Sequence, residues 1–255
     1  MIALENLLAF LEDTFHVSTC TDNSYNGLQF EGRGKIKNLV TGVDASTVFL
    51  KRAISSKADI AIVHHGLFWK GQEWKRIDQF SREKVALLTR GKLNLYALHL
   101  PLDSHPELGN NIRIAMAIGA RPDEGFYEYQ GQKIGMIAHL EKALTPEVFR
   151  KKIETSIGPV LKHLNFGPAT IKKIGIVSGG GWGSITDPVV ASGKVDAILT
   201  GEVLHQAVDS CRDRGVHMFS AGHYATEVFG VKALGELIAS KFGIRHTFLD
   251  FPTGL

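Results

Sequence analysis

Short apolar runs alternate with amphipathic stretches along most of the chain, and this alternation limits the fold more than any other feature of the sequence. In the first half, residues 37–44, 59–65 and 93–98 are predicted strands, and helical patterns begin near residue 46 and cover residues 81–91. The same order returns between residues 171 and 251. Strands that alternate with helices in this way form parallel βαβ units. We therefore predict an α/β fold with mainly parallel sheets in two α/β lobes.

The two lobes are expected to meet in sequence near residue 125. The segment 121–132, "RPDEGFYEYQGQ", is polar and rich in turn-forming residues, which is typical of a connection between domains. The first lobe, residues 1–125, would carry the motifs "HHG" and "HLPLD". The second lobe, residues 126–255, would carry the motif "GHYATE", with its C-terminal part returning to the first lobe.

The composition is that of an ordinary globular protein. The 255 residues are 44% hydrophobic and 22% charged, and no apolar run approaches the roughly 18–20 residues of a membrane span. The N-terminal stretch carries acids where a signal peptide would carry basic residues, and two cysteines are too few for a disulfide framework. A cytoplasmic protein without a membrane partner is expected. The net charge of +3 is spread over short clusters and supports nucleic-acid binding only weakly.

Histidines stand where predicted strands end. His64 and His65 close the apolar run 59–63, and His99 follows the run 93–98. Neighbouring residues on a strand point to opposite faces, so two adjacent imidazoles can reach one point only where the strand stops. The carboxyl ends of parallel strands are also where ligands collect in α/β sheets. This edge is therefore the predicted functional site.

Two further strand exits share the pattern H-x-x-x-[D/E]. His99 and Asp103 stand four residues apart, as do His223 and Glu227. On a helix, positions i and i+4 lie on one face, so an imidazole and a carboxylate could converge on one ion. Pro101 argues against a helix in the first pattern, whereas the second is predicted to be helical.

Together these motifs supply more donors than one tetrahedral ion needs. Mixed imidazole and carboxylate sets suit Zn²⁺, Fe²⁺, Mn²⁺ or Ni²⁺, and the motifs contain no thiolate. Two ions bridged by a carboxylate could share a hydroxide, which is the chemistry of metal-assisted hydrolysis. Taken singly, each motif is more often structural, as a histidine bonded to a backbone carbonyl or as a surface pair. The candidate donors are His64, His65, His99, Asp103, His223 and Glu227.

Other residues near these motifs have two interpretations each. Asp44, at another strand end, could orient a ligand or cap a helix, and His205 could line the same pocket. Trp69 and Trp74 could form a pocket wall, although core packing is favoured. The glycine-rich segment 178–184, "SGGGWGS", could be a weak anion site or a tight turn.

The motifs "YNGLQFEG", "IVHHGLFWKG", "LYALHLPLDSHPELGNN" and "GHYATE", in this order, resemble the NGG-interacting-factor-three-like family, whose members carry the label GTP cyclohydrolase I type two. The similarity runs from about residue 22 to the end and is greatest to the short bacterial form. It implies two intertwined α/β domains with a dinuclear metal site between them and a ring-shaped homohexamer. It also implies two divalent transition-metal ions per chain, Fe, Zn or Mn. The ligands that the resemblance implies are His64, His65, Asp103, His223 and Glu227.

Three functions remain open on the sequence. The first is a metal-dependent hydrolase that uses a metal-bound hydroxide on a small, possibly nucleotide-like, substrate. The second is a GTP cyclohydrolase-type ring opening, and the third is a non-enzymatic metal-handling or regulatory ring protein. His99 and His205 are the nearby candidates for acid–base catalysis. Many relatives have H-T-N-L-D where this chain has "HLPLD", so His99 keeps its place while the residues between it and Asp103 change.

Overall fold

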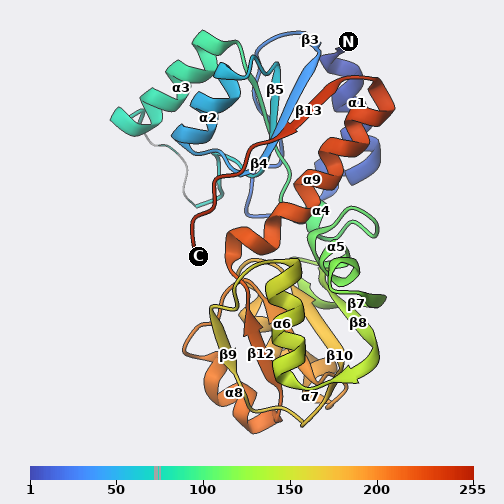
Figure 1. The fold of residues 1–255 in the computed structure, drawn as a ribbon. Coiled ribbons are helices and arrows are strands. Elements are labelled where there is room, and N and C mark those ends of the chain that lie inside the picture. The colour runs from blue at the N-terminus through green and yellow to red at the C-terminus, as the bar shows by residue number, and fades with distance from the viewer. Residues whose placement is uncertain (72–73, 75) are drawn as a thin grey trace. The chain divides into compact units, whose positions relative to one another are not determined.

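The chain folds into two compact units (Figure 1). The computed structural model describes residues 1–71, 74 and 76–255. Unit 1 consists of residues 1–105 and 230–251, and unit 2 consists of residues 106–229 and 252–255. The chain therefore passes from unit 1 to unit 2, returns to unit 1 within helix α9 (His223–Phe242), and enters unit 2 again at its end.

Unit 1 is built on a five-stranded sheet whose order is β13-β4-β5-β6-β2. The first four strands are parallel neighbours and β2 is an antiparallel edge strand. The strands are β13 (Arg245–Phe248), β4 (Asn38–Asp44), β5 (Ile60–His65), β6 (Asn94–Ala97) and β2 (Gly27–Phe30). A separate antiparallel pair joins β1 (Ile2–Ala3) to β3 (Lys35–Ile36).

Two helices of unit 1 begin at side-chain caps that the sequence supplies. Ser46 caps α2, as predicted, by accepting from the N–H of Phe49. The start of α3 was predicted too late, because Asp78 accepts from the N–H groups of Phe80 and Ser81 and fixes the first turn earlier. The helices of this unit are α1 (Leu4–Phe15), the 3₁₀ turn η1 (Val17–Thr19), α2 (Thr47–Ser55), α3 (Gln79–Gly91), α4 (Leu100–Asp103) and the later part of α9.

The central strands of unit 1 are buried on both faces. All four residues of Ile60–Val63 in β5 are fully buried, and all of β6 is buried. Parallel strands covered on both faces read as continuous apolar runs, which explains the sequence pattern. The apolar run therefore continues directly into His64, which is itself 0% exposed.

Unit 2 contains a six-stranded sheet whose order is β7-β8-β10-β11-β12-β9. Strands β10, β11 and β12 are parallel, and the other pairings are antiparallel. The α/β fold class with parallel central strands is thereby confirmed in both units. The strands are β7 (Ala120–Tyr129), β8 (Gln132–Leu144), β9 (Lys162–Leu164), β10 (Ile171–Val177), β11 (Ala197–Thr200) and β12 (His217–Ser220).

The helices of unit 2 pack their apolar residues into two clusters of core residues. They are α5 (Asn110–Ala117), α6 (Pro146–Ser156), the 3₁₀ helix η2 (Gly181–Thr186), α7 (Pro188–Ala191), α8 (Ala207–Arg214) and the beginning of α9. Phe149 of α6 is fully buried and meets Phe219 of β12 edge to face, at 5.2 Å between ring centroids. This aromatic pair fixes α6 against the sheet.

The polar segment 121–132 forms a β-hairpin where the sequence suggested a turn-rich connection. Strands β7 and β8 pair from Ala120 with Leu140 to Tyr129 with Gln132. Gln130 and Gly131 both have positive φ, at 51° and 79°, as the tightest hairpin turns require. The turn residues were thus recognised, but the strands on either side of them were not.

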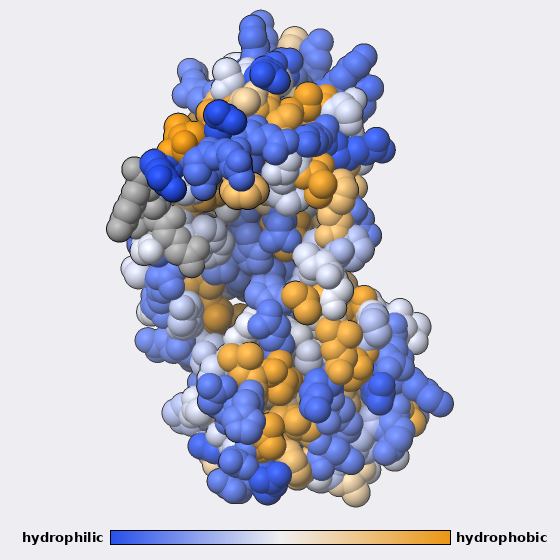
Figure 2. Space-filling model, turned by 90° about the vertical axis from the view of Figure 1, so that its left-hand side faces the viewer, coloured by the Kyte–Doolittle hydropathy of each residue, from blue (hydrophilic) through white to orange (hydrophobic). Residues whose placement is uncertain are grey.

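One face of unit 2 carries exposed apolar side chains, visible as the orange areas in the lower part of Figure 2. Leu161 and Leu204 of unit 2 are half exposed and line a groove of about 550 Å³ together with His205. None of the helices in the described part of the chain is both long and apolar enough to cross a membrane.

Candidate metal centre

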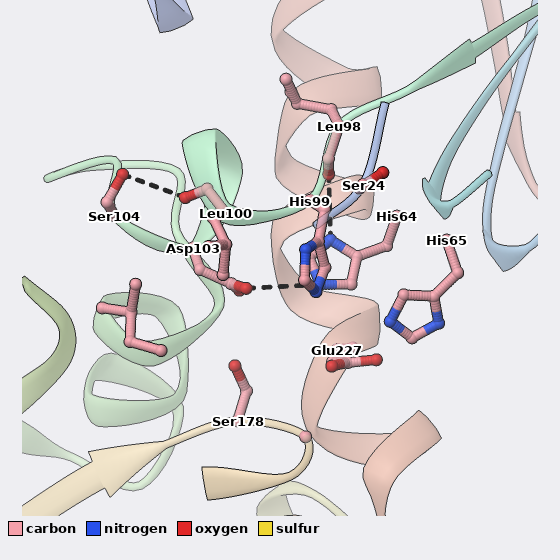
Figure 3. A network of polar contacts seen from close by, with 12 residues as sticks. Ser24, His64, His65, Leu98, His99, Leu100, Asp103, Ser104, Ser178 and Glu227 are labelled. Atoms are coloured by element: carbon pink, nitrogen blue, oxygen red, sulfur yellow. Dashed lines mark hydrogen bonds and ion pairs between the residues drawn. The ribbon is translucent and has the colours of Figure 1, made fainter. Parts of the chain in front are cut away.

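Three imidazoles converge at the carboxyl edge of the unit 1 sheet (Figure 3). His64 and His65 end β5, and His99 follows β6. The two strands are parallel neighbours with Val63 beside Ala97, so the segments that follow β5 and β6 leave the sheet at neighbouring positions of the same edge. One ring nitrogen of each histidine lies within 4.8 Å of the others, and these three residues could therefore hold a metal ion.

Each of these imidazoles is oriented by an oxygen at its Nδ1 atom. His64 Nδ1 lies 3.0 Å from the carbonyl oxygen of Leu98, and His65 Nδ1 lies 2.8 Å from Oδ1 of Asp44. His99 Nδ1 lies 2.9 Å from Oδ1 of Asp22. Carbonyl and carboxylate oxygens only accept, so each Nδ1 carries a proton, and in the neutral form of each ring Nε2 keeps its lone pair. This tautomer is the one in which a histidine binds a metal through Nε2.

Asp22 is the most deeply buried carboxylate of this cluster, with 1% of its surface exposed. It accepts from the ring of His99, from the backbone N–H groups of Leu100 and Ser24, and from the side-chain amide of Asn26. Burial opposes ionisation, but the hydrogen bonds and the charge of His99 outweigh it and lower the pKa of Asp22 to about 2. Asp22 is therefore a fixed anion at neutral pH.

Asp103 adds a carboxylate to the same group. Its Oδ2 atom lies 3.4 Å from Nε2 of His64, as the dashed line in Figure 3 shows. The expectation that Pro101 would prevent a helix after His99 was wrong: α4 is a short helix with the proline in its first turn, where no intrahelical N–H is required. The first H-x-x-x-D pattern therefore includes a helical turn as well.

Unit 2 presents a second pair of donors on one turn of α9. His223 is the first residue of α9, and its Nε2 atom lies 3.1 Å from Oε1 of Glu227, four residues later. Nδ1 of His223 lies 2.6 Å from Oε1 of Glu202, so this imidazole too has an oxygen acceptor on Nδ1. Glu227 is almost fully buried, at 3% exposure. A buried carboxylate and an oriented imidazole are again groups that suit a divalent cation.

The glycine-rich segment makes room for this pair. Gly179 has φ +60°, and a Cβ atom there would overlap Oε1 of Glu227. A Cβ atom on Gly201 would lie 2.8 Å from Cα of His223. The tight turn predicted for residues 178–184 is thus present, and its first glycine has a packing reason that requires no phosphate.

The residues with two predicted interpretations are resolved differently by the structure. Asp44 orients His65, so of its two predicted roles the structure supports that of a partner to a candidate ligand. Trp69 packs beside His65 and His99, at 5.8 and 5.1 Å between ring centroids, whereas Trp74 belongs to the core. His205 is exposed in the groove of unit 2 and belongs to no metal-ligand group found among the described residues.

Sequence reasoning missed two oxygen partners of the imidazoles, namely Asp22 and Glu202. Asp22 precedes the motif "NGLQ" by four residues, in a segment to which no chemistry could be assigned. Glu202 directly follows Gly201 at the exit of β11, within "TGEV". For Glu202 a signal was present, a carboxylate beside a glycine at a strand exit, which is the kind of position that identified the histidines. Asp22 lies in the loop before β2 and carried no such signal.

The chain is similar to several known proteins over almost its whole length. The sequence profile of the family described as Duf34/NIF3 (NGG1p interacting factor 3) matches residues 2–253. A protein of Archaeoglobus fulgidus named GTP cyclohydrolase 1 type 2 homolog is 40% identical over 252 residues, which are 99% of each chain. The solved structure of the protein ybgI is similar over 100% of both chains, with 34% identity and a TM-score of 0.92. The crystal structure of TTHA1606 from Thermus thermophilus also matches over 100% of both chains, with 31% identity and a TM-score of 0.87.

Proposed function

The chain belongs to the Duf34/NIF3 family, and from this premise we propose that it is a metal-dependent hydrolase acting on a small substrate, with nucleotide-like compounds as the first class to test. Two divalent ions per chain, Fe, Zn or Mn, would be held by the donors of the two units. The proposed ligands are His64, His65 and Asp103 from unit 1 and His223 and Glu227 from unit 2.

The observation that carries this proposal is the orientation of the imidazoles. In unit 1 and in unit 2 alike, an oxygen acceptor fixes Nδ1 of each proposed histidine ligand. A hydrogen bond that Nδ1 donates leaves the lone pair of Nε2 to bind a metal and raises the basicity of that nitrogen. Imidazole and carboxylate sets without thiolates are typical of Zn, Fe and Mn sites in hydrolases rather than of structural zinc sites.

The division of labour among the residues follows from this geometry. The carboxylates of Asp44 and Glu202 hold the rings of His65 and His223 at fixed angles. Asp103 and Glu227 supply negative charge beside His64 and His223, which offsets the charge of a bound cation. Bound divalent ions would act as Lewis acids and lower the pKa of water at the site.

A second candidate function is the opening of the guanine ring of GTP. The specific support is the name of the Archaeoglobus relative, GTP cyclohydrolase 1 type 2 homolog. Fold similarity alone does not transfer a reaction, so GTP enters the test as one substrate among several.

We also propose that the protein assembles as a ring-shaped homohexamer and acts in the cytoplasm, in line with its family. Multi-angle light scattering of the purified protein checks the assembly, with a mass of six chains as the expected result. A monomer at micromolar concentration would contradict it.

The reaction is tested by a screen of phosphoesters, nucleotides including GTP, and small amides with metal-loaded protein. Asp103→Asn should lower the turnover number by roughly 100-fold or more with a smaller change in KM, because an amide cannot balance the charge of the cations as a carboxylate does. Asp123→Asn is the matched control, because it alters an Asp–His pair on the surface of unit 2.

Metal content is measured in every variant of this screen. An activity that survives Asp103→Asn at full strength would belong to a contaminant and contradict the proposal. Inactivity across the whole panel with metal bound would favour a non-enzymatic metal-handling or regulatory ring instead.

A further inference from the structure

A cavity of about 610 Å³ lies within unit 1, between helix α1 and the part of the sheet formed by β2 and β6. All of its lining residues belong to unit 1, and none of them is a proposed metal ligand. We propose that this cavity, which we name the α1 cavity, binds a dipeptide with apolar side chains. Such binding goes beyond the proposed function and does not depend on it, because it requires neither a metal ion nor a reaction.

Two buried hydroxyl groups that belong to the lining of the α1 cavity lack partners. Tyr96 of β6 is 3% exposed, and its phenol hydroxyl forms no hydrogen bond with any residue that the structure describes. Ser24 is also 3% exposed, and its Oγ atom has no hydrogen-bond partner within the same described ranges. Buried polar groups nearly always have a partner, so a ligand with hydrogen-bonding groups suits this cavity better than a purely apolar one.

The phenol of Tyr96 stays neutral at any physiological pH. Burial raises the pKa of Tyr96 to about 13, and the negative charge of Glu12 acts in the same direction. A neutral hydroxyl can donate to a carbonyl oxygen and accept from an N–H group. A peptide bond offers both groups side by side, which favours a peptide over a single amino acid as the ligand.

The lining also contains one charge of each sign. Glu12 of α1 accepts from the hydroxyl of Ser18 at 2.5 Å and from its backbone N–H at 3.1 Å, and these hydrogen bonds lower the pKa of Glu12. The carboxylate is therefore an anion at neutral pH and has acceptor positions left for an ammonium group. Lys70 is exposed and forms no ion pair with a described residue. A ligand with an ammonium group and a carboxylate matches both charges, as the two ends of a dipeptide do.

The rest of the lining is largely apolar. Leu8 of α1, Val17 of η1 and Leu28 of β2 lie in the same cavity, and Tyr25 adds an aromatic ring that is 42% exposed. Apolar surface of this kind gains from covering an apolar ligand. The cavity volume also lies within the roughly 300–1,000 Å³ of small-molecule pockets. Leucine and phenylalanine side chains on the dipeptide therefore suit these walls.

The loop that forms the floor of the α1 cavity is fixed before any ligand binds. The backbone N–H of Tyr25 donates to the carbonyl oxygen of Phe68 at 3.1 Å, and that of Lys70 donates to the carbonyl oxygen of Asn23 at 2.7 Å. Two chain segments are thus tied together beneath the cavity. A preformed site spends little free energy on ordering when a ligand binds, so even a small ligand can be held.

Isothermal titration calorimetry with leucyl-phenylalanine tests the proposal on the full-length protein. The expected Kd lies below about 1 mM. N-acetyl-leucyl-phenylalanine, which lacks the ammonium group, and leucyl-phenylalaninamide, which lacks the carboxylate, should each bind about 3- to 10-fold more weakly. The titration is repeated after treatment with EDTA, because a dipeptide can also chelate a bound metal ion. The same affinity is expected with and without EDTA.

Matched variants place the ligand in the α1 cavity. Glu12→Gln should remove the preference for the free ammonium group, and Lys70→Met should remove the preference for the free carboxylate. Ala9→Trp should abolish binding, because Ala9 is an exposed residue of α1 that lines the cavity. Asn6→Trp is the control, because Asn6 is exposed on the same helix and does not line the cavity. Circular dichroism checks the fold of each variant, and the Glu12→Gln comparison remains decisive if Ala9→Trp is unfolded.

Three results would overturn the proposal. The first is no binding of leucyl-phenylalanine at millimolar concentration, which would leave the cavity to water. The second is binding that disappears with EDTA, which would assign the dipeptide to a metal ion. The third is a preference for the free ammonium group that Glu12→Gln leaves unchanged, which would place the ligand elsewhere. None of these results bears on the proposed hydrolase, and a protein that binds no metal could still bind the dipeptide.

Discussion

The two units build their candidate metal donors in different ways. In unit 1, His64, His65 and His99 come from the ends of two neighbouring strands, and Asp22, the partner of His99, lies 77 positions before it. In unit 2, His223 and Glu227 lie on one helical turn and meet through local periodicity. The first set depends on the register of a whole sheet, whereas the second depends on four residues of helix and a glycine turn.

This difference predicts how each set responds to change. A set assembled from distant segments should be lost when the sheet or its packing is disturbed. A set on one helical turn should tolerate distant changes and respond to changes in its immediate surroundings. The predictions below challenge this contrast, from the largest expected effect to the smallest.

Truncation of one core aromatic in each unit should show that the two donor sets depend on separate cores. Phe49→Ala in unit 1 and Phe149→Ala in unit 2 should each lower the free energy of unfolding by about 3–5 kcal/mol, because both rings are fully buried. Hydrogen exchange should show lost protection mainly in the unit that carries the substitution. Equal loss of hydrogen-exchange protection in both units from either variant would contradict the view that the two donor sets depend on separate cores.

Gly179→Ala should disable the unit 2 donors alone. The new Cβ atom would overlap Oε1 of Glu227 and would require a left-handed backbone at φ +60°. Loss of at least one bound ion is expected by metal analysis. Gly180→Ala is the matched control, because nothing lies within 4 Å of its Cβ position and its φ is −78°. Equal metal loss in both variants would show that a change in the turn, and not displacement of the Glu227 carboxylate, causes the loss.

The carboxylates that orient the imidazoles should matter equally in both units. Asp44→Asn removes the charge beside His65, and Glu202→Gln removes the charge beside His223. Each should weaken metal binding by about 10- to 100-fold without unfolding the protein. Competition titration with a chromophoric chelator measures the affinity. Unchanged affinity in both variants would remove the main support for the proposed ligands.

The smallest expected effect is a pH dependence of the free energy of unfolding, which arises from His163 in unit 2. Burial lowers the pKa of His163 to about 4, and the charges of His217 and Arg150 act in the same direction. The folded state therefore favours the neutral ring. The unfolded chain takes up a proton at this histidine below about pH 6.5, whereas the folded protein does so only near pH 4, so the stability of the folded protein falls as the pH drops from about 6.5 to about 4.

His163→Phe should reduce this pH dependence while keeping the stacked contact on Phe219. Because His163 is only partly buried, the difference between pH 7 and pH 5 should stay below about 1 kcal/mol. Urea unfolding of the metal-free protein at several pH values measures it. If His163→Phe and the wild type showed the same pH dependence of the free energy of unfolding, titratable groups other than His163 would be its cause.

Much of the fold could be predicted from the sequence because its signals are local. Apolar runs such as Ile60–Val63 and caps such as Ser46 reflect burial and hydrogen bonds within a few residues. The hairpin of β7 and β8 was missed because β7 is polar and many of its residues are exposed, so the apolar pattern that marks a strand is weak there.

The candidate site divides in the same way. His223 and Glu227 could be paired from helical spacing, and the histidines of unit 1 could be placed at strand ends. Asp22 could not be found, because its contact with His99 depends on how the loop before β2 folds back over the sheet. Long-range contacts of this kind leave no periodic signal in a single sequence.

Metal binding by these side chains is tested most directly by metal analysis of anaerobically purified protein. After reconstitution with Fe²⁺, Mn²⁺ and Zn²⁺ and removal of excess metal, we expect about two ions per chain, with at least one lost in His65→Ala and in Glu227→Ala. Both variants should keep the circular dichroism spectrum of the wild type, because His65 is the last residue of β5 and Glu227 lies near the start of α9. A stoichiometry that stays near zero, or two variants that are both unfolded, would contradict the account and make these side chains structural.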